Sequence, residues 1–230
     1  TPGDEKAHVA GFCLGEGIVD QPDDITNIAF CDGEDTNVVT VTLTADRRTR
    51  IADHLDRRTY ISQTSCGICG KSIVDDLVQA LTPVPDGDPL DAQRALDRLI
   101  HLGDHQPLRA KTRAAHAAAI YDRDLARLSI AEDVGRHNAL DKSIGMLFMD
   151  NRLSQAHLLT LSSRISYELV QKAARARIPV ILAVSRPTAL AVQLATALNM
   201  TLASLGKNDD LMVYCHAWRL DGSSKPTAQE

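Results

Sequence analysis

Aromatic residues are scarce in this sequence, making up 3% of its 230 residues although 44% are hydrophobic. The core must therefore consist mainly of Leu, Val, Ile and Ala, and the length suits one large domain, or one domain with a smaller lobe. No apolar run approaches the roughly 18 residues of a membrane-spanning helix, so we expect no membrane span. The net charge of −5, with the two signs mixed, argues against a general nucleic-acid binder.

Cysteine is also sparse. Of the five cysteines, Cys13, Cys31 and Cys215 are scattered, and a disulfide framework is therefore not expected. This composition favours a reducing cytoplasm. The first residues, Thr1 to Lys6, resemble neither a signal peptide nor an initiator Met, so we expect the true N-terminus to be missing.

The sequence also lacks the ligand sets of the common zinc sites. A structural zinc site takes four ligands, usually from two paired sets, and there is one C-x-x-C here. Zinc deaminases combine H-x-E with P-C-x-x-C, but none of the eight histidines is followed two residues later by Glu, and Ser65 stands where the proline belongs. We expect no metal site.

The single C-x-x-C consists of Cys66 and Cys69, each followed by a glycine. The pair lies at or just before the N-terminus of an expected helix, where free N–H groups and the helix dipole favour a thiolate, and Lys71 adds positive charge. The pattern alone fits half a zinc site, a dithiol redox pair, a sulfur carrier or two buried thiols. The amphipathic pattern that predicts the helix is formed by Ile73, Val74, Leu77, Val78 and Leu81.

A thioredoxin-like protein is one alternative, because C-G-x-C before a helix resembles that family. However, that family usually has an aromatic residue directly before the pair, whereas the only tryptophan here is Trp218. The pair also lies too deep in too long a chain for that fold. A thiol-disulfide oxidoreductase is kept as an alternative function.

The N-terminal half predicts fewer regular elements. We expect a helix over residues 4–14 with Val9, Phe12 and Cys13 inward, a strand over 39–44, and a polar, Arg-rich segment over 45–59. A later helix is expected to begin with Asp88 as N-cap and to stop at Gly103. Residues 45–104, which carry the cysteine pair, are a candidate for a smaller helical/β subdomain.

The C-terminal half alternates strands with helices. Segments 118–121 and 125–130 predict a hairpin, followed by a helix after residue 138. Strands are then expected at 158–161, 180–184, 201–205 and 211–214, with helices at 166–177 and 188–198. This rhythm predicts a three-layer α/β/α fold with a mainly parallel sheet. We assign residues 1–220 to a single domain and residues 221–230 to a polar tail.

Three polar turns follow strands of this sheet: Glu132 to Asn138, Ser162 to Arg164 and Ser185 to Thr188. In such sheets ligands bind beyond the carboxyl ends of the strands. Each turn opens a helix and carries an arginine, a combination suited to phosphate. Any one of these turns is explained by helix capping alone, and His137 by itself could be a structural hydrogen-bond partner. The three turns taken together predict a phosphate-bearing ligand. The candidate binding residues are Arg136, His137, Ser163, Arg164, Ser185 and Arg186.

The segment from Glu132 to Lys142, EDVGRHNALDK, is similar to the signature of the formate dehydrogenase accessory sulfurtransferases, the FdhD family. Cys66 to Gly70 resembles the cysteine motif of that family. With four further segments that resemble the family, the resemblance covers nearly the whole chain. These segments are Thr1 to Asp4, Gly11 to Gly17, Arg164 to Ala173 and Pro179 to Thr188.

The resemblance implies a cytidine-deaminase-like α/β fold without the zinc site, and a relay of sulfur. A cysteine desulfurase would give persulfide sulfur to Cys66, with Cys69 as partner or resolving thiol. The sulfur would pass to the molybdenum bis(molybdopterin guanine dinucleotide) cofactor before its insertion into formate dehydrogenase. The resemblance also implies a homodimer, guanine nucleotides as surrogate ligands, and contacts to the cofactor from Leu205, Gly206, Lys207, Asn208, Asp209 and Asp210.

The sequence departs from the family pattern at several positions. Arg113-Ala114 replaces a glycine pair, Ser163-Arg164 replaces Gly-Arg, and Lys207 stands for an arginine beside the negative Asp209 and Asp210. These departures concern the cofactor contacts more than the sulfur chemistry. A chaperone that binds the cofactor without transferring sulfur is the remaining alternative.

Overall fold

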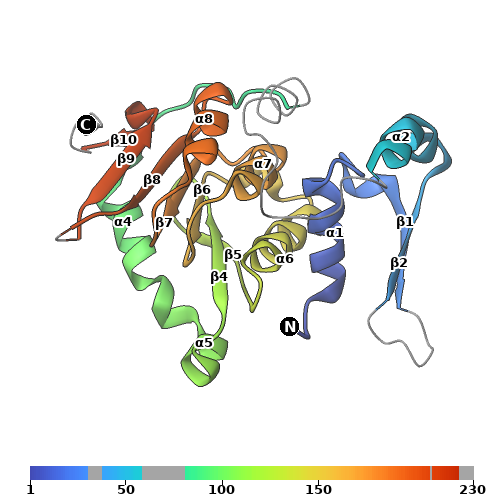
Figure 1. Ribbon diagram of the computed structural model, residues 1–230, viewed down its shortest axis with the longest axis horizontal. Helices are drawn as coiled ribbons and strands as arrows, with labels where there is room; N and C mark the ends of the chain where they lie inside the picture. The colour runs from blue at the N-terminus through green and yellow to red at the C-terminus, as the bar shows by residue number, and fades with distance from the viewer. Residues whose placement is uncertain (31–37, 59–80, 208, 223–230) are drawn as a thin grey trace.

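The protein is organised around one six-stranded sheet (Figure 1). The structure, a computed structural model, describes residues 1–30, 38–58, 81–207 and 209–222. The strand order is β5-β4-β6-β7-β8-β9. Its strands are β4 (His116–Tyr121), β5 (Arg127–Asp133), β6 (Leu158–Leu161), β7 (Val180–Ala183), β8 (Thr201–Leu205) and β9 (Leu211–Cys215).

The sheet is mixed, so the expectation of a mainly parallel sheet is wrong. The pairs β6–β7 and β7–β8 are parallel, whereas β4–β5, β4–β6 and β8–β9 are antiparallel. The predicted hairpin of β4 and β5 is confirmed, and the antiparallel pairs that were not predicted are β4–β6 and β8–β9. Five residues join β4 to β5, and another five join β8 to β9. A parallel pair needs a crossover of a dozen or more residues, so these short loops can only form hairpins.

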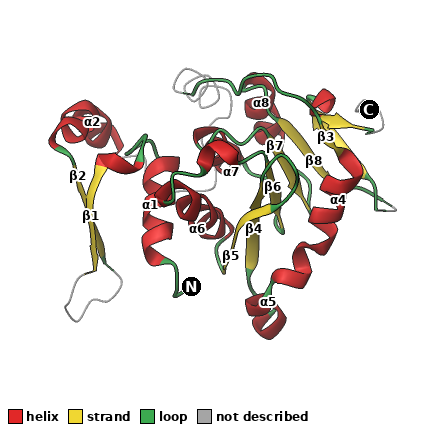
Figure 2. Ribbon diagram, turned by 180° about the vertical axis from the view of Figure 1, so that it is seen from behind, coloured by secondary structure: helices red, strands yellow, loops and turns green. Residues whose placement is uncertain are grey.

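Helices cover both faces of the sheet, which confirms the three-layer arrangement (Figure 2). Because side chains alternate along a strand, Ile120 and Leu159 face one layer while Tyr121 and Leu158 face the other. The first layer contains α1 (Glu5–Gly15), α6 (Arg136–Met149), α7 (Tyr167–Arg175) and α8 (Ala189–Ala197). The second contains α4 (Ala92–Ile100) and the 3₁₀ helix η2 (His101–His105).

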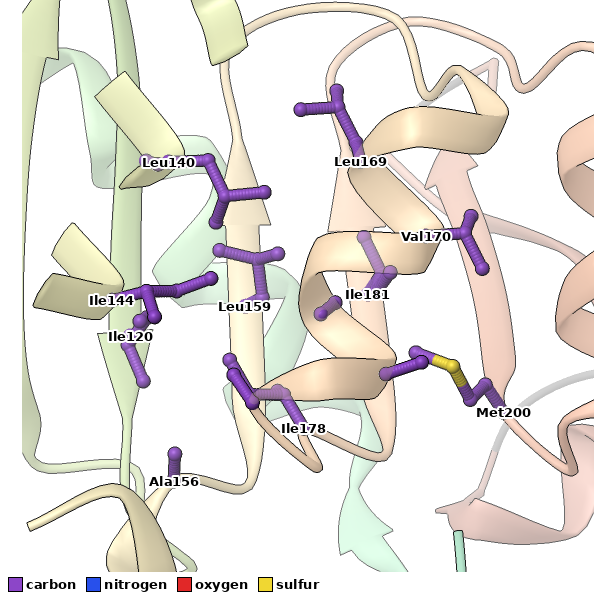
Figure 3. Packing of buried hydrophobic residues seen from close by; sticks show 14 of the residues in the cluster. Ile120, Leu140, Ile144, Ala156, Leu159, Leu169, Val170, Ile178, Ile181 and Met200 are labelled. Carbon is purple, nitrogen blue, oxygen red and sulfur yellow. The ribbon is translucent and has the colours of Figure 1, made fainter. Parts of the chain in front are cut away.

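The larger core lies between the sheet and the first layer (Figure 3). Ile120, Leu159 and Ile181 contribute from three neighbouring strands, and each is fully buried. Leu140 from α6 and Leu169 from α7 pack onto them. This aliphatic packing agrees with the near absence of aromatic residues.

A small unit stands beside α1, formed by the antiparallel strands β1 (Ile25–Phe30) and β2 (Val39–Leu43) with helix α2 (Ala45–Arg58) (Figure 1). Short elements complete the structure: the parallel pair β3 (Leu90–Asp91) and β10 (Leu220–Asp221), helix α5 (Pro107–Thr112), and the 3₁₀ helices η1 (Pro22–Asp24), η3 (Leu153–Gln155) and η4 (Ala217–Arg219).

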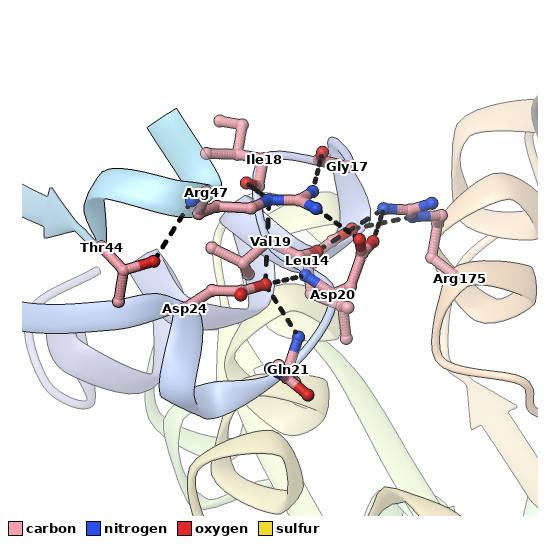
Figure 4. A network of polar contacts seen from close by, with 10 residues as sticks. All are labelled: Leu14, Gly17, Ile18, Val19, Asp20, Gln21, Asp24, Thr44, Arg47 and Arg175. Carbon is pink, nitrogen blue, oxygen red and sulfur yellow. Dashed lines mark hydrogen bonds and ion pairs between the residues drawn. The ribbon is translucent and has the colours of Figure 1, made fainter. Parts of the chain in front are cut away.

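A polar network ties α2 to the main body (Figure 4). The buried guanidinium of Arg47 donates to Ile18 O at 2.7 Å and to Gly17 O at 2.9 Å, and it forms an ion pair with Asp20. The other carboxylate oxygen of Asp20 pairs with Arg175 of α7 at 2.9 Å. Asp20 therefore joins two arginines from elements far apart in sequence.

Five details of the N-terminal half differ from the prediction. Phe12 is 45% exposed rather than inward, because the small residues of α1 face α6 and Phe12 lies beside the Lys172 ammonium. The Arg-rich segment is helical, and β1 was not predicted. The N-cap of α4 is Asp91 rather than Asp88, since the Asp91 carboxylate accepts from Arg94 N at 2.8 Å. The 3₁₀ helix then continues past Gly103.

Cys66, Cys69 and Asn208 lie outside the described residues, as does most of the expected tail. The subdomain at residues 45–104 stays a prediction. Within the described ranges, α4 packs on β6 and β7 of the main sheet. None of the helices described is long and apolar enough to cross a bilayer.

Candidate functional site

Four polar connections meet at one edge of the sheet. Strands β5, β6, β7 and β8 all end there, because β5 and β6 both run antiparallel to β4. The register places Leu161 of β6 beside Ala183 of β7, and Ala183 beside Ser204 of β8. The three predicted turns and the 205–210 loop therefore lie along a common edge, which we call the carboxyl edge. What they bind remains a prediction.

The loops after β6 and β7 run side by side. Ile165 and Pro187 form an isolated parallel bridge, and Thr188 N donates to Ile165 O at 3.0 Å. Arg164 and Arg186 are exposed on these loops, and neither side chain has a hydrogen bond or ion pair in the described structure. Two free guanidiniums are thus presented from adjacent loops.

The two serines of these loops differ. Ser163 is buried, and its hydroxyl donates to Arg164 O at 3.0 Å. Ser185 is exposed. Ser163 therefore already has an internal partner, whereas Ser185 remains open to a ligand.

Arg136 begins α6, and its Nε atom is buried with no hydrogen-bond partner in the described structure. The Nδ1 atom of His116, at the start of β4, is likewise buried and unpartnered. Burial lowers the pKa of His116, and the nearby guanidiniums of Arg136 and Arg109 lower it further. His116 is therefore a neutral imidazole within a positive field.

His137 lies beside the first turn of α7. Its Nε2 atom is 3.4 Å from Ser166 Oγ. Burial and the Arg136 cation lower the pKa of His137, against an opposing effect of the Glu168 carboxylate. Glu168 Oε2 is itself buried without a hydrogen-bond partner in the part of the chain described. These groups can exchange hydrogen bonds with a ligand.

The helix N-termini at this edge are not equivalent. The N-cap of α6 is Gly135, which has no side chain, and the N-cap of α7 is Ser166, whose side chain accepts no hydrogen bond from its helix. In α8 the Thr188 side chain accepts from Ala191 N at 3.2 Å. Ordinary capping therefore explains the third turn, while the first two leave N–H groups free for an anion.

The loop after β8 forms a tight turn, in which Gly206 N donates to Asp210 O at 2.7 Å. Lys207, Asp209 and Asp210 are exposed, and Leu205 is half-buried. The negative charge that distinguishes this loop from the family pattern therefore faces solvent beside the end of β7.

Two buried ion pairs hold the turn after β5, and sequence reasoning missed both. Asp133 and Lys142 are 1% and 2% exposed and 2.9 Å apart. Asp133 also accepts from Gly135 N at 2.9 Å. Burial alone raises the pKa of Asp133, but that hydrogen bond and the Lys142 ammonium outweigh it and hold the pKa below its usual range.

Asp141 forms the second pair, at 2.8 Å from Lys172 Nζ. Burial raises the pKa of Asp141 to about 6, against the opposing effect of Lys172. A signal was available for the first pair: Lys142 is a charged residue between Leu140 and Ile144, which lie on the apolar face of its helix. Asp133, Asp141 and Lys142 of the segment 132–142 are therefore buried in structural ion pairs.

The described cysteines are packing residues. Burial raises the pKa of the Cys13 thiol to about 11. Cys215 is half-buried, its Sγ donates to Met200 O at 3.2 Å, and burial raises its pKa. Neither thiol is set up to be a nucleophile. Among the described residues, no group of three or more His, Cys, Asp or Glu side chains is placed to hold a metal ion.

The chain is similar to known proteins over most of its length. The model of the FdhD/NarQ family matches residues 1–221. The sulfur carrier proteins FdhD of Mycobacterium tuberculosis and Mycobacterium bovis are each 39% identical over 234 residues, covering 96% of this chain and 83% of theirs. The sulfur carrier protein FdhD of Variovorax paradoxus is 35% identical, covering 96% of this chain and 79% of its own.

A solved structure shares the fold. It is the crystal structure of a candidate formate dehydrogenase accessory protein from Desulfotalea psychrophila, with a TM-score of 0.71. The match covers 95% of this chain and 80% of that one at 21% sequence identity.

Proposed function

The chain belongs to the FdhD/NarQ family, and from that premise we propose that it is a sulfur carrier acting as an accessory protein to a formate dehydrogenase. The observation that carries this proposal is the 39% identity to sulfur carrier proteins over 96% of the chain. The enzyme class is a sulfurtransferase with a persulfide intermediate. We place it in the cytoplasm, as a homodimer, with no nucleic-acid partner.

The sulfur donor is a persulfide on a cysteine desulfurase. The Cys66 thiolate attacks the terminal sulfur of that persulfide, and a new S–S bond forms on Cys66. The bond between the terminal sulfur and the desulfurase cysteine breaks, and the desulfurase leaves as a thiolate. The step needs no oxidant, because sulfane sulfur is exchanged between thiolates. Cys69 is the partner or resolving thiol.

The acceptor is the molybdenum bis(molybdopterin guanine dinucleotide) cofactor, bound as substrate before insertion into formate dehydrogenase. The carboxyl edge supports this part of the proposal. Arg164 and Arg186 are unpaired there, Arg136 has an unpartnered Nε, and the α6 and α7 N-termini lack side-chain caps. These groups suit the phosphates of the dinucleotide, and Lys207 lies on the loop assigned to the guanine end.

Sulfur uptake is tested by intact-protein mass spectrometry after incubation with a cysteine desulfurase and cysteine. We expect wild type to gain sulfur and Cys66→Ala to gain none, because the proposed nucleophile is gone. Cys215→Ala is the matched control and is expected to gain sulfur as wild type does, since its thiol is engaged and half-buried. Cys69→Ala reports whether the partner thiol is needed for uptake.

An adduct on Cys66→Ala equal to that on wild type would assign the carrier to another residue. If no form gains sulfur while cofactor binding is intact, the chaperone function replaces the sulfur carrier. A disulfide between Cys66 and Cys69 that turns over with thioredoxin substrates would instead favour the oxidoreductase.

Anion binding at the carboxyl edge is tested with guanosine diphosphate by isothermal titration calorimetry at fixed ionic strength. We expect Arg136→Gln to weaken binding about tenfold or more, because a hydrogen bond to a charged group contributes about 1.5–3 kcal/mol. Arg164→Gln and Arg186→Gln are expected to have smaller effects, since both side chains are exposed. Arg177→Gln, an exposed arginine after the far end of α7, is the charge-matched control. Equal affinity in all four variants would disprove the assignment.

A further inference from the structure

A second cluster of arginine and histidine side chains lies at the opposite end of β4 from the carboxyl edge. It lines an open pocket of about 280 Å³. Tyr121 at this end of β4 is five residues from His116 at the carboxyl edge, roughly 17 Å along a strand. The residues with polar side chains in its wall are Arg98, His101, His105, Tyr121 and Arg127.

Three elements build this pocket. Arg98 comes from the last turn of α4, and His101 and His105 come from η2, which continues that helix. Tyr121 ends β4 and Arg127 begins β5, at the base of the hairpin between them. Because α4 and η2 cover this face of the sheet, side chains from the helical layer and from the hairpin reach the same space.

Several groups in the wall have no partner. Tyr121 is 3% exposed, yet its hydroxyl makes no hydrogen bond within the described structure, and the residue lines the pocket. The side chains of Arg98, His105 and Arg127 also make no hydrogen bond or ion pair there. The Tyr121 hydroxyl therefore opens to the pocket rather than being enclosed in the core, and it can donate to an acceptor bound there.

Other arginines on the same helix and hairpin do form hydrogen bonds or ion pairs. Arg94, one turn before Arg98, donates to Asp124 O at 2.7 Å. Arg123, on the hairpin, pairs with Asp88 at 2.5 Å. The two arginines that line the pocket are the ones left unpaired.

The side chains that line the pocket favour an anion over a cation. Among the described residues, no Asp or Glu lines the pocket. Of the acidic residues close in sequence, Asp97 accepts from Gln93 Nε2 at 3.3 Å and Asp122 from Ala126 N at 2.8 Å, while Asp104 and Asp124 are exposed and lie outside the pocket wall. Although two histidines could ligate a metal, two unpaired guanidiniums beside them would repel a cation.

We propose that this pocket binds a small phosphate-bearing anion, at a site separate from the carboxyl edge. Two guanidiniums and a phenol supply donors, and two imidazoles supply further hydrogen-bonding groups, from three elements. Such a set matches the three terminal oxygens of a phosphoryl group better than the two oxygens of a carboxylate. His101 Nδ1 lies 2.9 Å from Asp97 O, so that nitrogen is the donor; Nε2 then accepts from a phosphate hydroxyl, and it donates to a phosphate oxygen only when the ring carries a second proton. The volume admits a phosphoryl group with a small organic part.

The test is an NMR titration of the histidine Cε1–H resonances with pyrophosphate, inorganic phosphate and acetate at constant ionic strength. His101→Gln and His105→Gln assign the two resonances. We expect pyrophosphate and phosphate to shift both resonances saturably and acetate to do so at least tenfold more weakly. Arg98→Gln and Arg127→Gln are each expected to weaken phosphate binding at least tenfold. Lys111→Gln, an exposed lysine on α5, is the control and is expected to bind as wild type does.

Both arginines are exposed, so their variants are expected to unfold at the wild-type temperature, which thermal melting checks. Sulfur uptake and guanosine diphosphate binding are expected to be unchanged, which separates this site from the proposed function. Absence of saturable shifts, equal shifts with acetate, or unchanged phosphate affinity in both arginine variants would each overturn the proposal.

Discussion

Gly145→Ala is expected to unfold the protein or to lower its free energy of unfolding by at least about 3 kcal/mol, the upper range for overpacked cores. A Cβ at Gly145 would lie 1.7 Å from Ala7 O and 2.6 Å from Ala7 C. Gly11 faces it reciprocally: a Cβ there would lie 1.9 Å from Asp141 O. Both clashes are with backbone, so no side-chain rotation relieves them, and α1 must move away from α6.

The separation would expose the apolar face of α1. Cys13 and Leu14 are 4% and 3% exposed, and they belong to the larger core. The measurement is the urea midpoint of unfolding followed by circular dichroism. Gly103→Ala is the matched control, because a Cβ there meets nothing within 4 Å, and its effect is expected within about 0.5 kcal/mol. A wild-type midpoint for Gly145→Ala would show that the two helices do not cross this closely.

Asp133→Ala is expected to lower the free energy of unfolding by about 3–5 kcal/mol, the cost of leaving a buried charge without its partner. Lys142 is 2% exposed, and after the substitution its remaining bond is to Thr1 O at 2.7 Å. The paired double variant Asp133→Leu, Lys142→Met separates loss of charge pairing from loss of volume. We expect it to recover most of the stability, because an apolar pair can replace a buried ion pair.

The exposed pair Arg123–Asp88 supplies the control for Asp133→Ala. Its side chains are 45% and 79% exposed, so Asp88→Asn is expected to change stability by less than about 1 kcal/mol. Equal urea midpoints for Asp133→Ala and Asp88→Asn would contradict the assignment of Asp133 as a buried anchor.

The same carboxylate predicts a dependence on pH. An unfolded chain protonates an aspartate near pH 4, whereas the folded chain holds the pKa of Asp133 below its usual range. Below about pH 4 the unfolded state binds more protons, so the free energy of unfolding falls as the pH decreases towards the folded pKa. In Asp133→Asn this contribution is absent. Below pH 4 the free energy of unfolding of the variant is therefore expected to decrease less steeply with pH than that of wild type.

The C-terminal half could be predicted from the sequence because its periodicity is strong. The strands at 158–161 and 201–205 coincide with β6 and β8, and each inter-strand helix lies where expected. Periodicity does not give strand direction, so the antiparallel pairs β4–β6 and β8–β9 were not predicted, whereas the short connection between β4 and β5 did predict a hairpin. α2 was missed because its side chains are mostly charged and give no continuous apolar stripe.

The candidate site could be predicted as far as its loops. The turns after β5, β6 and β7 were predicted because each follows an expected strand, opens an expected helix and carries an arginine. What could not be predicted are contacts between positions far apart in sequence. Asp141 and Lys172 are 31 residues apart, and Gly11 meets a helix that begins at Arg136. The cysteine pair remains a prediction.

The crossing of α1 and α6 also affects how the chain is made. α1 ends at Gly15, but its partners extend to Met149 on α6 and to Lys172 on α7. At translation rates of about 5–20 residues per second, the nascent helix waits on the order of 10–30 s before Lys172 has been synthesised. Until α6 has been synthesised, the Cys13 and Leu14 side chains have no docking surface. Helix α1 is therefore a segment that needs shielding on the ribosome during that time.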